Sequence, residues 1–435
     1  MHGQATLIQA LFGFIFLIAL SFCFSENKRK INWKLIASAF ILQNILFLLI
    51  RYVPFVSNGL SHISTLLLSL LGFAQDGARF IFGDFVDSQK YGFAFILVVI
   101  PTLIFFGSLI SALYFFGIIQ RIIALLAFLL RKSVRLSGVE SLIVIADIFL
   151  GQSEGPLVIG PYVKSMTRSE LAMAFTAGLA NLSGSTLGIY LVFLSGGDKL
   201  QTLMFANYLV TATFMNAVSA IIFAKILFPE IEYANTSSEK IEVKAHFTSN
   251  FIDSIFQGAM TGLKVGAAMV AILLAVISLI HMLDGILAWL GDLIQVNDLI
   301  NSSSHGVFKS LSLEYILGQL FRVFAFFMGI SWSETLSVGS LLGQKVAINE
   351  FVAYVSLGQM KLEHVISANS IFISTFALAS FSNFSSIGIS LGAFSVLAPS
   401  RQKELSAIAW KALFGAILAG FMTATVAGFW HNILG

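Results

Sequence analysis

Two stretches of the chain place acidic side chains among long runs of apolar residues. Residues 140–161 contain Asp147 and Glu154, and residues 329–354 contain Glu350, each accompanied by amide or hydroxyl side chains. Carboxylates accept hydrogen bonds or bind cations, and amides both donate and accept hydrogen bonds. The two stretches could therefore recognise a small polar solute or hold a cation.

The composition places these polar groups in a membrane. Of the 435 residues, 57% are hydrophobic and only 11% are charged, and the mean hydropathy is +0.90. Soluble domains carry about 25% charged residues, so a soluble globular protein and a disordered tail are excluded. Cys23 is the single cysteine, which rules out an intrachain disulfide, and a net charge of +3 is too small to indicate nucleic acid. We therefore predict a polytopic membrane protein built from helices.

The predicted membrane helices are continuous apolar windows with few or no charges. A span needs about 20 such residues. Residues 57–86 and 251–264 mix charged and apolar side chains, so we expect both segments to form helices that lie in the interface. The windows predicted to span are residues 1–25, 35–50, 91–120, 171–197, 200–224, 265–283, 365–400 and 412–435.

Basic residues suggest the orientation of the chain. The densest basic cluster is residues 26–34, and Arg131, Lys132 and Arg135 form a second short patch. Because positive residues stay cytoplasmic, we expect both at the inner face and the N-terminus outside. The polar residues 229–250 divide the chain near its middle as a solvent loop or hinge.

The acidic stretches are predicted to form re-entrant helical hairpins. Each apolar piece beside residues 151–156 is only about ten residues long, too short to cross a bilayer. A charge at bilayer depth costs about 2.5–3.5 kcal/mol, so Glu154 and Glu350 need a polar role there. Non-helical backbone is tolerated at this depth only where protein or a water cavity surrounds it, and its freed polar groups can become ligands.

The features of the first half recur in the second half. Each acidic stretch is followed by a charge-free segment with a polar centre, which reads LANLSG at residues 179–184 and FSNFSS at residues 381–386. A hairpin followed by a polar, broken helix in each half matches the inverted internal repeats of secondary transporters. The repeat predicts one binding site formed by both halves.

Some of these polar residues also admit purely structural roles. Ser183 and Ser385 could each bond a neighbouring helix. Glu140 could cap its own helix or pair with Arg135, and Glu334 is expected to cap a helix. For Glu154 and Glu350, each beside amide or hydroxyl residues in a broken element, a functional role is the favoured interpretation.

Two other classes of function fit the sequence less well than a carrier does. Residues 151–155 match G-x-S-x-G, the nucleophile motif of serine hydrolases, but that motif requires a strand, turn and helix in a soluble sheet. An intramembrane serine hydrolase is therefore a minor alternative. A channel suits hairpins that close over a site less well than an occluding carrier does.

At these motifs the sequence resembles the bacterial concentrative nucleoside transporter family over nearly the whole chain. The stretches that carry the resemblance include FLGQSEGPLVIGPYVKSMTRSEL at 149–171, WSETLSVGSLLGQKVAINEFVAY at 332–354 and FSNFSSIGISLG at 381–392. The resemblance implies an all-α fold with eight transmembrane helices, interfacial helices and two opposed re-entrant hairpins. It also implies a homotrimer in which a transport domain moves against a trimeric scaffold.

The resemblance implies roles for individual residues. The first hairpin would contact the nucleobase through Gln152, Ser153 and Glu154, with Thr186 lining that side. The second half would hold the ribose hydroxyls, because a carboxylate can accept both donors of a diol. The predicted substrate-binding set is Gly151, Gln152, Ser153, Glu154, Thr186, Glu350, Phe381, Asn383 and Ser386.

The predicted site of the coupling cation departs from the sodium-coupled pattern. The positions that match the ion site of sodium-coupled members are Asp147, Leu150, Asn181 and Leu182, of which the two leucines would offer backbone carbonyls. Asp147 stands where Asn is expected, and Asn181 where Ser is expected. A carboxylate can ligate sodium, or it can carry a proton because burial favours its neutral form. We expect cation symport, with the proton favoured over sodium.

The sequence thus predicts a non-enzymatic symporter of the bacterial inner membrane that imports nucleosides by elevator-type alternating access and needs no cofactor. A symporter for another small polar solute is the closest alternative. The predicted division is 1–136 as scaffold, 137–228 as the first transport half, 229–310 as loop, interfacial helix and scaffold helix, and 311–435 as the second transport half.

Overall fold

The computed structural model describes residues 2–87, 94–195, 198–232, 250–304 and 306–434, which are almost entirely helical and contain no strand. The N-terminal part comprises α1 (His2–Cys23), α2 (Trp33–Tyr52), α3 (Pro54–Phe82), α5 (Phe95–Phe115) and α6 (Ile118–Val134). The first half continues with α7 (Gly138–Phe149), α8 (Gly155–Val158), α9 (Arg168–Ala180), α10 (Gly184–Ser195) and α11 (Lys199–Leu227).

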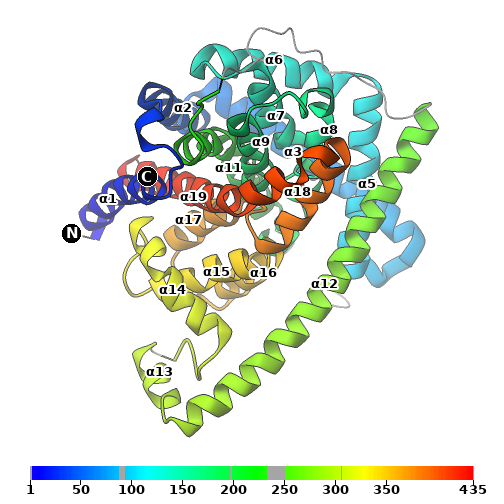
Figure 1. Cartoon of the computed structure of the whole chain (residues 1–435). Coiled ribbons are helices and arrows are strands. Elements are labelled where there is room, and N and C mark those ends of the chain that lie inside the picture. Colours follow the sequence, from blue (N-terminus) through cyan, green and yellow to red (C-terminus); the bar gives the residue numbers. More distant parts are fainter. Residues whose placement is uncertain (1, 88–93, 196–197, 233–249, 305, 435) are drawn as a thin grey trace.

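The second half starts with the long helix α12 (Phe251–Leu293), which runs along the outside of the molecule (Figure 1). The remaining helices are α13 (Asn297–Ser303), α14 (Leu313–Phe327), α15 (Thr335–Ala347), α16 (Glu350–Leu362), α17 (Ala368–Leu378), α18 (Phe384–Leu397) and α19 (Gln402–Leu434). The predicted polar segment 229–250 falls largely on residues 233–249, which lie outside the described residues.

The same order of elements occurs twice. A pair of short helices, a broken helix and one long helix form α7 to α11 in the first half and α15 to α19 in the second. The long members α11 and α19 pack against each other and bury most of their residues, so they form the centre of the molecule. The predicted boundaries at 136, 228 and 310 each fall between helices.

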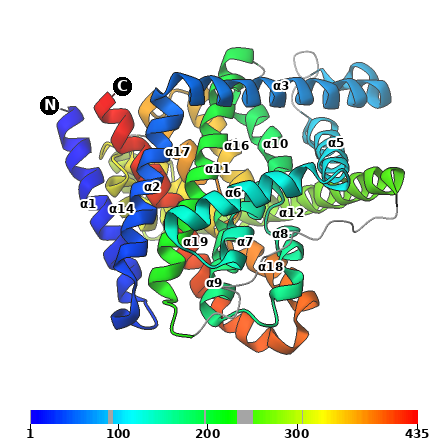
Figure 2. The ribbon, with the colours of Figure 1, turned by 90° about the horizontal axis from the view of Figure 1, so that it is seen from above.

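Among the described residues, six helices are long and apolar enough to cross a membrane by length and composition: Trp33–Tyr52, Pro54–Val86, Ile96–Phe115, Lys199–Leu227, Phe251–Leu293 and Pro399–Leu434. The shorter apolar helices that accompany them are Ile8–Cys23, Thr186–Ser195, Ala368–Leu378 and Phe384–Leu397. The chain is therefore a multi-pass membrane protein. Figure 2 shows α3 lying across the ends of the upright helices, the orientation expected of the interfacial segment 57–86.

The prediction of a separate interfacial helix at residues 251–264 is wrong. These residues are the first turns of α12, a continuous helix of 43 residues. The polar side chains Asp253, Gln257 and Lys264 do not interrupt it, because Gln257 and Lys264 are exposed and Asp253 is half-buried, while the opposite face of the helix packs on α5. A charged residue on an exposed helix face carries no signal that the helix ends.

Small residues hold α12 against α5. Gly258, Gly262 and Gly266 recur every four residues on the buried face of α12. A Cβ at Gly258 would collide with the backbone of Gly107, and a Cβ at Gly262 would collide with the backbone of Leu103. This spacing is the small-xxx-small pattern that lets membrane helices approach closely. The pair α5 and α12 therefore forms a tightly packed, apolar wall.

Candidate functional site

The first half presents a short helix pair that ends in a polar tip. The helix α7 begins with a capping box, in which Ser137 accepts from the Glu140 backbone N–H and Glu140 accepts from the Ser137 backbone N–H. It has 12 residues, about 18 Å, against a hydrocarbon core of about 30 Å. Gly151 follows at the tip with φ +77°, a left-handed conformation that glycine adopts without a Cβ penalty.

The second half presents an equivalent pair. The helices α15 and α16 meet at Ile348 and Asn349, and the Asn349 side chain caps α16 by accepting from the Val352 backbone N–H. Because Glu350 is the first residue of that helix, the cap fixes the backbone position from which its carboxylate extends. The helices α7, α15 and α16 have 12, 13 and 13 residues, and α8 has four, so each is shorter than a full membrane span.

The breaks of the two broken helices meet in the middle of the molecule. The helix α9 ends before Asn181, and α17 ends before residues 379–383. The Phe381 backbone N–H donates to the Asn181 carbonyl at 3.4 Å, which joins the two breaks directly. Asn383 caps α18 by accepting from the Ser386 backbone N–H at 2.9 Å.

A cavity of about 200 Å³ lies between the two tips and the two breaks. All nine residues of the predicted substrate-binding set line it. The first hairpin contributes Gly151, Gln152, Ser153 and Glu154, α10 contributes Thr186, and the second half contributes Glu350, Phe381, Asn383 and Ser386. The structure thus brings together residues that lie more than 200 positions apart in the chain.

Glu350 is the most constrained acid of the cavity. It is buried, its Oε1 accepts from the Tyr190 hydroxyl at 3.1 Å, and its Oε2 accepts from the Asn383 amide at 2.9 Å. Each carboxylate oxygen has two lone pairs, so both can still accept a further donor. Tyr190 itself lies against the rings of Phe351 and Tyr354. The acid is therefore held in one orientation with acceptor capacity left for a ligand.

Gln152 bridges the first hairpin to α18. Its Nε2 donates to the Ser386 hydroxyl at 3.1 Å, and its Oε1 accepts from the Ser390 hydroxyl at 3.3 Å. The Glu154 side chain lines the same cavity and makes no hydrogen bond or ion pair with the described residues. Amide and carboxylate together can match both the donors and the acceptors of a heterocyclic base.

A further wall of the cavity is uncharged and mostly apolar, and it was not anticipated from the sequence. It comes from α5 and α12 and comprises Leu103, Gly107, Thr261, Gly262, Val265, Met269 and Leu273. The signal that could have found this wall is the glycine spacing in α12, which marks a close helix pair. One wall therefore supplies hydrogen bonds, and the other supplies an uncharged surface.

The four residues predicted to hold the cation gather beside this cavity. Leu150 lines the cavity, whereas Asp147, Asn181 and Leu182 are fully buried behind it. Within the described part of the chain, neither carboxylate oxygen of Asp147 has a hydrogen-bond partner, and neither does Asn181 Oδ1. A Cβ at Gly155 would collide with the Asp147 carboxylate, and Gly178 lies in ordinary contact with the other side of that carboxylate. These unsatisfied acceptors fit a cation or a proton.

Two other acids have structural partners. Glu140 caps α7, which is one of the two roles expected from the sequence. Its ion-pair partner is the buried Lys225, so the alternative prediction of a pair with Arg135 is wrong. Lys225 is closer because α11 runs directly behind α7. Glu334 does not cap its own helix; its carboxylate accepts from the Ser367 backbone N–H at 3.0 Å, and Ser367 is the residue that caps α17.

The helical repeats and the shared polar cavity define a membrane carrier of the broken-helix type. Three family models match the chain: the C-terminus of Na+ dependent nucleoside transporters at residues 208–428, their N-terminus at residues 12–85, and nucleoside recognition at residues 96–197. The chain belongs to the concentrative nucleoside transporter family. This is a family of transporters and not of enzymes, so the hydrolase alternative has no support.

Relatives and solved structures cover the chain almost completely. It is 34% identical to the nucleoside permease NupC of Helicobacter pylori, over 96% of both chains, and 32% identical to the putative nucleoside permease NupX of Escherichia coli, over 98% and 99%. The structure of CNTnw in an inward-facing substrate-bound state matches with a TM-score of 0.85 and 34% identity, over 97% and 98% of the two chains. A CNTnw variant in an outward-facing state matches with a TM-score of 0.88.

Proposed function

We propose that this chain is a cation-coupled symporter that imports nucleosides across the bacterial inner membrane. The observation that carries the proposal is the cavity in which Glu350 and Asn383 of one half face Gln152 and Glu154 of the other. Permease relatives from bacteria support both the substrate class and the membrane.

The second half binds the ribose in this proposal. Both oxygens of Glu350 can accept hydrogen bonds from the 2′ and 3′ hydroxyls. The Asn383 amide nitrogen is held beside this carboxylate, 2.9 Å from Glu350 Oε2. Phe381 lines the same cavity and offers an apolar surface. A sugar that lacks a hydroxyl leaves a buried polar group unpaired, which costs about 1–3 kcal/mol.

The first half binds the base. Gln152 provides a donor and an acceptor from one amide, while Ser153 and Glu154 add a hydroxyl and a carboxylate. Thr186 lies beside Ser183, whose hydroxyl donates to it at 3.2 Å, so its position at the cavity wall is supported.

Asp147 is proposed to carry the coupling charge, with the proton favoured over sodium. An isolated buried carboxylate is expensive unless it is paired or neutral, and both oxygens of Asp147 lack partners among the described residues. Protonation satisfies this requirement without the several oxygen ligands that sodium needs. Leu150 and Leu182, with Asn181, complete the site if the cation is sodium instead.

Alternating access is proposed to be of the elevator type. The apolar wall formed by α5 and α12 offers no charged group that would hold the hairpins in one place. The scaffold would include residues 1–136 and α12, the two halves built on α7–α11 and α15–α19 would move together, and three copies would form a homotrimer.

The coupling ion and the substrate can be tested in one system. Purified protein in vesicles should accumulate labelled uridine when an inward pH gradient is imposed without sodium. Accumulation that follows a sodium gradient and ignores the pH gradient would overturn the proton assignment. Excess adenosine or uridine should block the uptake; block by unrelated small sugars instead would favour a carrier for another polar solute.

A further inference from the structure

A second, larger cavity lies away from the nucleoside cavity. It has a volume of about 790 Å³ and is bordered by the start of α2, the end of α6, the start of α7 and the end of α11. The basic residues that line it are Lys30, Arg131, Lys132, Arg135 and Lys225. Its acidic lining residues are Glu140 and Glu230.

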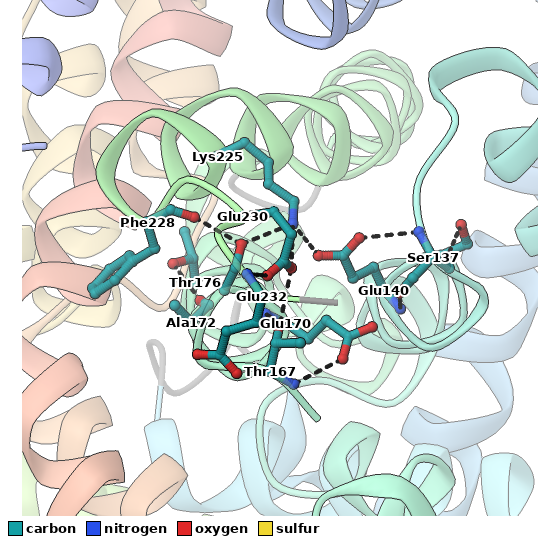
Figure 3. Close-up of polar contacts among 12 residues, drawn as sticks. Ser137, Glu140, Thr167, Glu170, Ala172, Thr176, Lys225, Phe228, Glu230 and Glu232 are labelled. Atoms are coloured by element: carbon teal, nitrogen blue, oxygen red, sulfur yellow. Dashed lines mark hydrogen bonds and ion pairs between the residues drawn. The ribbon is translucent and has the colours of Figure 1, made fainter. Parts of the chain in front are cut away.

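The acids of this cavity are already engaged, as Figure 3 shows. Glu140 pairs with Lys225 and caps α7. Glu230 Oε2 accepts from the Thr167 hydroxyl at 2.8 Å and lies 3.8 Å from Lys225 Nζ. Lys225 is thereby neutralised by its own neighbours. The inner wall of the cavity is a closed polar cluster that needs no further partner.

The cations at the rim are different. Lys30, Lys132 and Arg135 are exposed and form no ion pair with any other described residue, and Arg131 lies beside them on α6. Lys30, Lys132 and Arg135 thus bring three positive charges to a cavity in which Glu230 is the one lining acid left after Glu140 pairs with Lys225. The C-terminus of α6 adds a negative partial charge of about half a unit, which the three cations outweigh. An anion with several acceptor oxygens suits this arrangement.

An apolar strip continues from these cations along α6. Phe128 and Leu125 precede Lys132 by four and seven residues, so the three side chains share one face of the helix. Phe128 is 63% exposed and Leu125 is 60% exposed. Leu129 is also exposed and widens the strip. A ligand with a negative head and hydrocarbon tails would therefore contact both the cations and the strip.

The rim also lies at the face that the sequence assigns to the cytoplasm. Residues 28–30, which form a short 3₁₀ helix, and residues 131–135 meet here although they are about 100 positions apart. Basic pockets between membrane helices at the cytoplasmic side are suited to anionic lipid headgroups. The bilayer itself supplies such a ligand at high local concentration.

We propose that this cavity binds the phosphate headgroup of an anionic phospholipid, with the acyl chains lying along Leu125, Phe128 and Leu129. The lipid would contact the start of α7 and thus the base of the hairpin that carries Gln152 and Glu154. This site is separate from the nucleoside cavity and does not depend on the proposed substrate or coupling ion.

The test is native mass spectrometry of the full-length protein in detergent with added phosphatidylglycerol or phosphatidylcholine. Wild-type protein should retain phosphatidylglycerol in preference to phosphatidylcholine. The triple variant Arg131→Gln, Lys132→Gln, Arg135→Gln should bind phosphatidylglycerol about tenfold more weakly or worse, since each basic residue near a surface adds to the attraction of anionic lipid. Equal retention by the variant and the wild type would overturn the proposal.

The matched control removes the same charge elsewhere. Lys199→Gln, Lys309→Gln, Lys403→Gln changes three exposed lysines outside the cavity and should leave lipid retention unchanged. If the basic triple variant fails to fold, as judged by loss of its unfolding transition, the single variant Lys132→Gln should still weaken retention measurably. A loss of the same size in the control would show a nonspecific charge effect and reject the site.

A soluble headgroup separates a lipid from a free phosphate. Glycerophosphoglycerol, which has the headgroup of phosphatidylglycerol without acyl chains, should compete poorly at equal concentration, because it cannot contact Phe128. Inorganic phosphate should compete no better. If either soluble phosphate binds as tightly as the lipid, the apolar strip contributes nothing and the lipid assignment is wrong.

Discussion

Glu350 and Asn383 are 33 residues apart in the chain, and their side chains share a hydrogen bond of 2.9 Å inside the buried cavity. Asn383 also caps α18, so the same amide fixes a helix start and orients the acid. The break in the helix thus places both groups side by side. Because neither group is free to turn away, a ligand meets a preformed pair of acceptor and donor.

The first prediction concerns the charge of Glu350. Glu350→Gln removes the second acceptor oxygen and should lower uridine uptake by about 100-fold, because charge-assisted hydrogen bonds contribute about 1.5–3 kcal/mol each. Uptake into vesicles measures this effect. Glu363→Gln, the same change at the exposed residue just after the end of α16, should keep wild-type uptake. Normal uptake by Glu350→Gln would remove this residue from the site.

The second prediction concerns the ribose hydroxyls. The 2′-deoxy and 3′-deoxy forms of uridine should inhibit uptake of labelled uridine about 10- to 100-fold more weakly than uridine, because each leaves a buried partner unpaired. The 5′-deoxy form serves as the control, since no residue is assigned to that hydroxyl. Equal inhibition by all four compounds would place Glu350 and Asn383 away from the ribose.

The third prediction concerns Asp147. Asp147→Asn keeps the shape of the side chain but removes its ability to carry a proton, so accumulation driven by a pH gradient should be lost. Exchange of nucleoside across the membrane without a gradient should persist, because the cavity itself is unchanged. Asp298→Asn, at an exposed position, is the control. Retained proton-driven accumulation in Asp147→Asn contradicts the coupling role.

The fourth prediction concerns the packing of α12 on α5. Gly262→Ala should lower the free energy of unfolding by about 1–3 kcal/mol, because the added Cβ overlaps the backbone of Leu103 and overpacking is costly. Gly285→Ala on the same helix meets no atom within 4 Å and should be neutral or slightly stabilising. Thermal unfolding of both variants in detergent measures the difference. Equal melting temperatures would show that this contact is loose.

The fifth prediction concerns the loop between α1 and α2. Glu26 accepts two hydrogen bonds from the Arg168 guanidinium. These bonds lower the pKa of Glu26, and the positive charges of Arg168 and Lys411 lower it further, whereas the partial burial of Glu26 raises it. A lowered folded pKa stabilises the fold above the unfolded pKa, near 4.3 for Glu, and this contribution is lost as the pH falls through the folded pKa.

The variant Glu26→Gln should therefore have a slightly lower free energy of unfolding than wild type at pH 7. The difference should be less than about 1 kcal/mol, because the ion pair is partly exposed. This difference in the free energy of unfolding between wild type and variant should become smaller as the pH drops below about 4.3. Glu363→Gln, an acid that has no lysine or arginine partner among the described residues, should show no such trend. A gap that stays constant down to acidic pH would assign the effect to something other than the ion pair.

Sequence reasoning was sufficient for everything that depends on local pattern. The membrane character follows from long uncharged windows, and the turn after α7 follows from Gly151. The repeat of LANLSG and FSNFSS pointed to two equivalent halves. Family resemblance at the same motifs named the nine residues that now line one cavity.

The tertiary structure decided what depends on which helices become neighbours. Residues 251–264 read as a separate segment, but packing on α5 makes them part of one helix. Glu140 pairs with Lys225 rather than the nearby Arg135, and the apolar wall of Leu103 and Met269 appears only once α5 and α12 meet. Hydrophobic periodicity indicates which face of a single helix is buried. Which other helix that face contacts depends on the packing of many segments together, so the local sequence does not determine it.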